Sequence, residues 1–293
     1  MDELNKPEQL AALLEEARYV ADPEMLTSLF LLLKLRKPLL LEGPPGVGKT
    51  ESALVLSTIL DVPLIRLQCY EGLDISSAVY EWNYQRQLLS IRMQESSQMT
   101  TEEKEHKIFG EDYLLKRPLL QAITQVDKSP VLLIDELDRS DEEFEAFLLE
   151  LLSAFQITIP ELGTVRATHK PYVILTSNRT RELSDALKRR CLYHWIGYPG
   201  LEKEMSIVKK RLPGIDDGLL EAVVRQVQQF RQQKLSKVPG ISETIDWAES
   251  LVALGHRSLN RKAVEDTLGA ILKSSEDIEL ARQQMTESVP STP

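Results

Sequence analysis

One stretch of the sequence has the residue types and spacing of a loop that binds phosphate groups. It follows the pattern G-x-x-x-x-G-K-[ST], and its residues are Gly43, Pro44, Pro45, Gly46, Val47, Gly48, Lys49 and Thr50. Glycines let the backbone curl so that several N–H groups point into one concavity, which suits oxygen anions. Lys49 would reach the outer phosphates of a nucleotide, and the Thr50 hydroxyl would bind Mg²⁺. The stretch predicts a site for ATP with Mg²⁺, and a glycine-rich structural turn is the alternative.

Two carboxylates follow a second apolar run. Residues 131–134 are all aliphatic, and Asp135 and Glu136 come directly after them. Ligands of open α/β sheets bind at the carboxyl ends of the strands, which is where these two side chains would lie. Asp135 would hold Mg²⁺ directly or through water, and Glu136 would polarise the water that attacks the γ-phosphate. The alternative is a strand that ends in a solvated acidic turn.

Two further residues suit the same chemistry. Asn178 follows the apolar run 172–177, where an amide can orient a water molecule while it donates to a phosphate oxygen. A single asparagine in this position is usually only a turn residue. Arg189 and Arg190 end a short predicted helix, where positive charge already favours the helix dipole. They also suit an arginine finger that reaches the nucleotide of a neighbouring subunit, with Arg190 the first choice and Arg189 the second.

The elements that would position these residues alternate between strands and helices. Short apolar runs predict strands at 37–42, 62–67, 131–134, 172–177 and 192–196. Helices are expected at 7–18, 23–36, 50–60, 118–126, 144–155 and 183–190. Alternating residues on either side of a turn indicate a β-hairpin at 156–168. This order predicts an α/β fold, a three-layer P-loop NTPase core with a parallel sheet.

The second part of the chain contains helical patterns and no further strand pattern. Helices are expected at about 202–211, 216–233, 242–254 and 260–273. We therefore expect an ATP-binding core at 1–198, a helical lid at 199–275 and a polar tail at 276–293. The core would carry inserts at about 69–117 and 156–168.

The first insert combines aromatic residues with arginines. Tyr70, Tyr80, Trp82 and Tyr84 lie close to Arg86 in the sequence. Such residues can stack on nucleobases or grip a peptide. Packing of an inserted helix onto the core is the favoured interpretation, because large aromatic side chains are mostly buried. The polar stretch 94–107 that follows is expected to be an exposed loop or a mobile helix.

Composition narrows the classes of function. The net charge of −10 and the pI of about 5.1 argue against nucleic acid as the main partner, because duplex binding depends on cationic contacts. Cys69 and Cys191 are too few for a disulfide framework or a zinc site. The N-terminus has no signal-peptide pattern, and the most apolar run, 26–35, is too short to span a bilayer. We expect a cytoplasmic protein with no membrane span.

The order of phosphate loop, Asp-Glu strand, Asn strand, Arg-ended helix and helical lid resembles the AAA+ ATPases over about residues 20–275. Within them, the sequence around the phosphate loop and the hairpin before the Asn strand resemble the MoxR family. The stretches 67–74, 81–85 and 242–247 are most similar to the subgroup of accessory ATPases linked to aerobic carbon monoxide dehydrogenase.

The resemblance implies a ring ATPase, usually hexameric, that remodels a client protein. It implies a partner with a von Willebrand factor A domain and, for the subgroup, a client metalloenzyme of the molybdenum hydroxylase class. It assigns the roles above to the matching residues Lys49, Thr50, Asp135, Glu136, Asn178 and Arg190. It also places Tyr19 and Val20 beside the adenine.

One departure from the family pattern concerns the third lid helix. Many relatives begin this helix with an arginine that senses the γ-phosphate, whereas residues 241–244 here read Ile-Ser-Glu-Thr. Either Arg257 or Arg261 substitutes for it, or the function is absent.

Two other classes of function fit the same core. The first is a nucleic-acid motor or the motor subunit of a nuclease, which the net charge disfavours. The second is a nucleotide-dependent scaffold that hydrolyses little, which the presence of Glu136 argues against.

Overall fold

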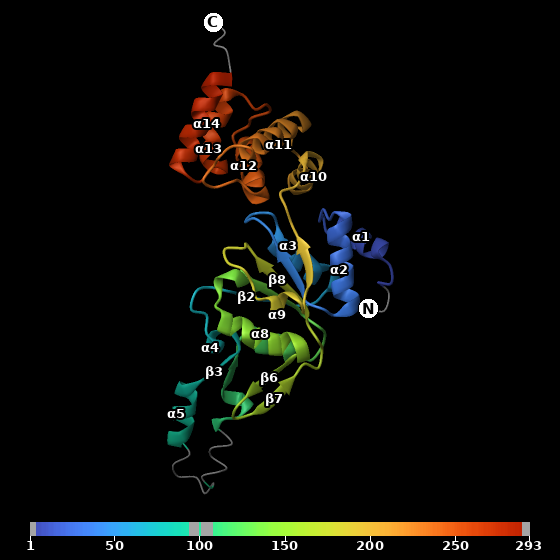
Figure 1. Ribbon diagram of the computed structural model, residues 1–293, viewed down its shortest axis with the longest axis vertical. Coiled ribbons are helices and arrows are strands. Elements are labelled where there is room, and N and C mark those ends of the chain that lie inside the picture. Colours follow the sequence, from blue (N-terminus) through green and yellow to red (C-terminus); the bar gives the residue numbers. More distant parts are fainter. Residues whose placement is uncertain (1–3, 94–99, 101–107, 289–293) are drawn as a thin grey trace. The chain divides into compact units, whose positions relative to one another are not determined.

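The computed structural model describes residues 4–93, 100 and 108–288, which form two compact units (Figure 1). Of the described residues, the first unit holds 4–7, 23–42, 50–93, 100 and 108–195. The second holds 8–22, 43–49 and 196–288. Most of the polar stretch 94–107 and the end of the expected tail, 289–293, lie outside the described residues.

A five-stranded parallel sheet forms the centre of the first unit, as the sequence predicts. Its strand order is β2-β5-β8-β1-β9, and every neighbouring pair is parallel. The strands are β1 (Leu39–Glu42), β2 (Leu64–Gln68), β5 (Val131–Asp135), β8 (Tyr172–Ser177) and β9 (Leu192–Trp195). β1, β5 and β8 are buried along their whole length, which explains their continuous apolar runs.

The register of the sheet brings the polar strand ends to one edge. Gln68 at the end of β2 pairs with Asp135 at the end of β5. Glu42 at the end of β1 pairs with Ser177 at the end of β8. The carboxyl ends of four strands therefore present polar side chains side by side, where α/β sheets bind ligands.

Helices cover both faces of the sheet, which confirms the three-layer α/β fold. They are α2 (Pro23–Leu35), α3 (Lys49–Leu60), α7 (Pro118–Ile123), α8 (Glu142–Ala154) and α9 (Asp185–Lys188). Alternate strand residues such as Leu40 and Ile134 share one apolar core with α7, α8 and α9. The intervening strand residues, such as Leu39 and Leu133, are equally buried and face the opposite layer, where α2 contacts β1, β8 and β9.

The predicted β-hairpin is confirmed. β6 (Gln156–Ile159) pairs in antiparallel register with β7 (Gly163–Arg166). The helix before it, α8, begins at an Asp141 side chain that accepts a hydrogen bond from the Phe144 N–H.

The insert at 69–117 contains more regular structure than its sequence indicates. Its elements are α4 (Ile75–Ala78), β3 (Tyr80–Trp82), α5 (Tyr84–Met93), the 3₁₀ turn η1 (Glu111–Tyr113) and β4 (Leu114–Lys116). β3 and β4 form a small antiparallel sheet, and Trp82 is buried edge-on against Tyr80 and Phe109. The interpretation favoured from the sequence, that these aromatic residues pack onto the core, therefore holds for Tyr80 and Trp82. It does not hold for Tyr70 and Tyr84, which are exposed.

The second unit is helical. Its helices are α1 (Pro7–Glu16), α10 (Leu201–Arg211), α11 (Asp217–Arg231), α12 (Ile241–Ala253), α13 (Arg261–Ile271) and α14 (Ser275–Ser288). α10 to α14 share one apolar core around Phe230 and Trp247. α14 occupies a stretch that we expected to be a polar tail. The buried Asp277 holds it by accepting hydrogen bonds from Ser236 and Lys237, a contact that periodicity does not reveal.

Over the residues that the structure describes, no helix combines the length and the apolar character needed to cross a bilayer.

Candidate active site

The phosphate-binding motif forms a turn between β1 and α3. Gly46 and Gly48 have φ values of +74° and +91°, which residues with a side chain rarely adopt. The Lys49 ammonium group is buried and donates to the carbonyl oxygens of Gly43 at 2.8 Å and Pro44 at 2.7 Å. Lys49 therefore closes the loop on itself, and its positive charge stays within the turn that would receive phosphate.

The next residue along the chain, Thr50, contacts the first acidic residue of the second motif. Its hydroxyl lies 3.2 Å and 3.3 Å from the two carboxylate oxygens of Asp135. A hydroxyl and a carboxylate are oxygen ligands of the kind that Mg²⁺ prefers. The two residues that the sequence assigns to the metal are therefore neighbours, although 85 positions separate them along the chain.

Two further side chains hold the Asp135 carboxylate. The Thr176 hydroxyl donates to its Oδ1 at 2.5 Å, and the Arg66 guanidinium donates to its Oδ2 at 2.6 Å. Asp135 is almost fully buried, whereas about half of the Arg66 side chain is exposed. The buried charge is thus balanced by a cation from β2, the neighbouring strand of the sheet.

Glu136 has the backbone and side-chain partners of a positioned residue. It adopts the left-handed conformation with φ of +53°, between β5 and the 3₁₀ turn η2 (Leu137–Arg139). Its N–H donates to the Thr176 hydroxyl at 2.9 Å. Its carboxylate accepts hydrogen bonds from Gln68 at 3.0 Å and from Arg139 at 3.2 Å. Glu136 is held in one orientation and yet remains about one-third exposed, so a water molecule can reach it.

Asn178 directly follows β8, which pairs with β5 in the sheet. The buried carboxylate of Asp138 holds the loop that begins at Asn178. The N–H groups of Asn178 and Thr180 donate to Asp138 at 3.1 Å and 2.8 Å, and the Thr180 hydroxyl donates at 2.7 Å. Burial would raise the pKa of the Asp138 carboxyl group. The hydrogen bonds from Thr180 and Asn178 outweigh burial and hold this pKa below its ordinary value of 3.8.

We predict that Asp138→Asn lowers the free energy of unfolding by about 1–3 kcal/mol at pH 7, because an amide has one acceptor oxygen instead of two and leaves the donors on the other position unpaired. Since the pKa of Asp138 is depressed in the folded state, its contribution is present above pH 3.8 and is lost as the pH falls through the folded value. Urea titrations should therefore show a difference from wild type that shrinks below about pH 4. Asp185→Asn, at an exposed position of α9, is the control. A difference that stays constant with pH would contradict this account.

Cys69 lies directly beside the carboxylates. It is fully buried, and its N–H donates to the Asp135 carbonyl at 2.8 Å. Burial raises the pKa of its thiol to about 12, and the negative charge of Asp135 adds to the shift. Cys69 is a packed thiol without nucleophilic character at neutral pH.

Arg190 projects from the end of α9 and is exposed. Its Nε donates to the Ser153 hydroxyl on α8 at 2.8 Å, and its Nη1 donates to the Ala186 carbonyl at 3.0 Å. Both contacts are made at the surface, so the guanidinium can exchange them for a phosphate or carboxylate of another molecule. Arg189 is exposed as well.

Tyr19 and Val20 belong to the second unit, where they follow α1 and are half-buried. Their place beside an adenine stays a prediction.

The residues of this arrangement that sequence reasoning missed include Arg66, Gln68 and Thr176. Arg66 and Gln68 lie on β2 and reach Asp135 and Glu136 because β2 is the immediate neighbour of β5 in the sheet. Thr176 bridges Asp135 and the Glu136 backbone from β8, on the other side of β5. Strand order would have identified them, but the order does not follow from one sequence.

Comparison with known proteins gives a family match and distant relatives. The AAA domain of the dynein-related subfamily matches residues 38–191. An uncharacterised protein of Staphylococcus epidermidis (strain RP62A) is 26% identical over 229 residues, which cover 76% of this chain and 78% of the relative. An uncharacterised protein of Staphylococcus aureus (strain RF122) is 28% identical over 218 residues, covering 72% and 74%. The structure of the Holliday junction branch migration motor RuvB of Thermotoga maritima is 17% identical with a TM-score of 0.44, and the match covers 91% of this chain and 68% of that one.

Proposed function

The chain belongs to the AAA domain family, in its dynein-related subfamily, and from this premise we propose that it is a ring-forming ATPase that remodels a client protein. Family membership makes it an ATP-hydrolysing enzyme, which converts ATP and water to ADP and phosphate. The ring, the client and the assignment of roles to individual residues are proposals. The observation that carries the residue roles is the network in which Thr50, Asp135, Thr176 and Glu136 are joined directly.

The residues divide the reaction between them. The glycine-rich loop and Lys49 bind the phosphates, and the Thr50 hydroxyl with the Asp135 carboxylate would hold the Mg²⁺ that accompanies ATP. When bound, Mg²⁺ would neutralise part of the phosphate charge. Glu136 orients the attacking water and accepts its proton, while Gln68 and Arg139 fix the carboxylate. Asn178 holds the same water or a phosphate oxygen from the end of β8.

A ring is proposed because Arg190 is exposed at the surface. An arginine that stabilises transferred phosphate charge can be supplied by a neighbouring molecule. Arg190 of one subunit would act on ATP bound by the next, so that hydrolysis depends on assembly. Sedimentation in the presence of ATP should show a closed oligomer, and we expect a hexamer. A monomer under these conditions would remove the basis for this step.

The finer assignment is to the MoxR type and to maturation of a molybdenum hydroxylase. It is supported by the sequence stretches 67–74, 81–85 and 242–247 and by the β6–β7 hairpin between α8 and β8. A partner with a von Willebrand factor A domain belongs to the same proposal. The net charge of −10 favours a protein client over nucleic acid.

A trapping experiment tests this proposal. Glu136→Gln, expressed in the source cell, should remain ATP-bound and retain its partners for identification by mass spectrometry. Lys49→Ala is the control. Loss of the Lys49 ammonium group should abolish binding of a fluorescent ATP analogue, so this variant should not retain partner proteins. Recovery of a von Willebrand factor A protein with a molybdenum hydroxylase, only with Glu136→Gln, is the expected result. Recovery of DNA or a nuclease, with ATPase activity stimulated by DNA, would overturn it in favour of a nucleic-acid motor.

A further inference from the structure

The second unit contains a direct backbone contact between its helical part and the phosphate-binding loop. The Ile241 N–H, at the start of α12, donates to the Gly46 carbonyl at 2.8 Å. Gly240, the residue before it, lies against the same peptide. A Cβ atom placed on Gly240 would come within 2.7 Å of the Gly46 Cα atom and within 2.8 Å of its carbonyl carbon and oxygen. Only glycine fits at position 240 while this contact exists.

This contact fixes one of the groups that would bind phosphate. The carbonyl of Gly46 and the N–H of Val47 belong to one planar trans peptide and point in opposite directions. A hydrogen bond that sets the direction of the Gly46 carbonyl therefore also sets the direction of the Val47 N–H. Gly46 has a φ of +74°, and as a glycine it carries no side chain that would limit rotation of the loop at this point. The bond from Ile241 supplies that restriction.

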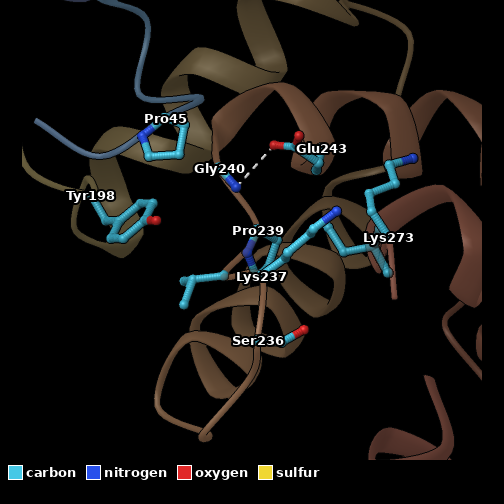
Figure 2. A pocket seen from close by; sticks show the side chains of 10 residues that line it. Pro45, Tyr198, Ser236, Lys237, Pro239, Gly240, Glu243 and Lys273 are labelled. Carbon is cyan, nitrogen blue, oxygen red and sulfur yellow. Dashed lines mark hydrogen bonds between the residues drawn. The ribbon is translucent and has the colours of Figure 1, made fainter. Parts of the chain in front are cut away.

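Hydrogen bonds from two sides hold the Pro239–Ile241 segment in place. The Glu243 carboxylate accepts from the Gly240 N–H at 2.9 Å, the bond drawn in Figure 2. The Pro239 carbonyl accepts from Arg231 Nε at 2.8 Å. The segment also lines a pocket of about 470 Å³, together with Glu243, Lys237 and Lys273. The hydrogen bonds from Arg231 and to Glu243 therefore restrict where the segment lies.

Arg231 is itself fixed by a buried ion pair. Its two terminal nitrogens donate to both carboxylate oxygens of Glu204, at 2.6 Å and 2.7 Å. The Arg231 side chain is 6% exposed and that of Glu204 is fully buried. The Thr244 hydroxyl on α12 also donates to Glu204, at 2.7 Å. Buried pairs of this kind add little net stability but impose one geometry, here shared by α10, α11 and α12.

We propose that Gly240 and Ile241 position the phosphate-binding loop for nucleotide, and that the Arg231–Glu204 pair positions Gly240 and Ile241. The inference rests on ATP binding by the loop, as described above. Many relatives have at the start of this helix an arginine whose positive charge senses the γ-phosphate, and this chain has none there. In this chain, residues 240–241 would instead act on the backbone of the phosphate-binding loop through a hydrogen bond.

The chain offers a matched pair of glycines for the test. Gly240 and Gly200 each precede the first residue of a lid helix in extended backbone conformations, with φ of −84° and −67°. A Cβ atom on Gly200 meets nothing within 4 Å. Gly240→Ala should weaken binding of a fluorescent ATP analogue about 10-fold and speed hydrogen exchange at the Val47 amide, because one hydrogen bond and the close contact are lost. Gly200→Ala should bind like wild type.

A second variant removes the N–H donor together with the buried Ile241 side chain. Ile241 is the first residue of α12, a position that accepts proline, so Ile241→Pro deletes the N–H without ending the helix. Ile241→Pro should weaken binding of the ATP analogue about as much as Gly240→Ala. If circular dichroism shows that Gly240→Ala does not fold, Ile241→Pro alone tests whether residues 240–241 position the loop.

The outcomes separate this inference from the proposed function. Wild-type protein that fails to bind the ATP analogue would contradict nucleotide binding by the loop itself. Wild-type binding that survives unchanged in both variants, with unchanged exchange at Val47, would overturn the positioning role alone. A lower melting temperature with unchanged affinity would overturn it as well, because it would reduce the contact to a structural one.

Discussion

Glu136→Gln is expected to lower kcat for ATP hydrolysis by about 10²–10⁴-fold while the affinity for ATP changes little. Glutamine keeps the shape of glutamate and can still contact Gln68 and Arg139, but its amide cannot accept a proton from water. The residues that would bind phosphate and Mg²⁺, Lys49 and Thr50, are unchanged. Steady-state phosphate release and the dissociation constant of a fluorescent ATP analogue measure the two quantities separately.

The control for this variant is Glu143→Gln, which makes the same chemical change at an exposed position of α8. It should hydrolyse ATP at the wild-type rate. Unchanged turnover in Glu136→Gln would show that another residue activates the water. Loss of both turnover and binding would show that the left-handed turn at Glu136, with its bond to Thr176, had been disturbed instead.

The sheet was predictable because its signals are local. β5 and β8 are buried on both faces, so their sequences are unbroken apolar runs that end in polar residues. The phosphate-binding loop can be recognised by its glycines, because Gly46 and Gly48 adopt backbone angles that other residues avoid. Chemistry that depends on one strand end or one loop can therefore be read from a single sequence.

The partners of these residues were not predictable because they come from neighbouring strands. Gln68 meets Glu136 only because β2 pairs with β5, and Thr176 meets Asp135 only because β8 pairs with β5 on the other side. The same applies to Gly240, whose closest neighbour, Gly46, is far away in the sequence. α14 was missed for a related reason, because the hydrogen bonds between Asp277 and Ser236 join segments that are distant in the sequence.

Arg190→Ala is expected to lower kcat by about 10³–10⁵-fold in the assembled protein, because the transferred phosphate loses a cation supplied by the adjacent subunit. Binding of the ATP analogue should change little, since Arg190 contacts Ser153 and Ala186 at the surface of its own subunit. Arg189→Ala is the matched control and should retain most activity. The reverse pattern would move the role to Arg189.

Mixing two inactive variants tests whether Arg190 acts between subunits. A ring assembled from Arg190→Ala and Glu136→Gln subunits contains some interfaces where an intact Glu136 on one subunit meets an intact Arg190 on the next. If Arg190 serves its neighbour, such rings should regain a measurable part of the wild-type turnover, although each variant alone is inactive. If Arg190 serves the nucleotide of its own subunit, every site in the mixture lacks one of the two residues, and no activity can return. Mixed rings that remain as inactive as either parent would therefore exclude the arginine-finger role and, with it, the argument that hydrolysis requires assembly.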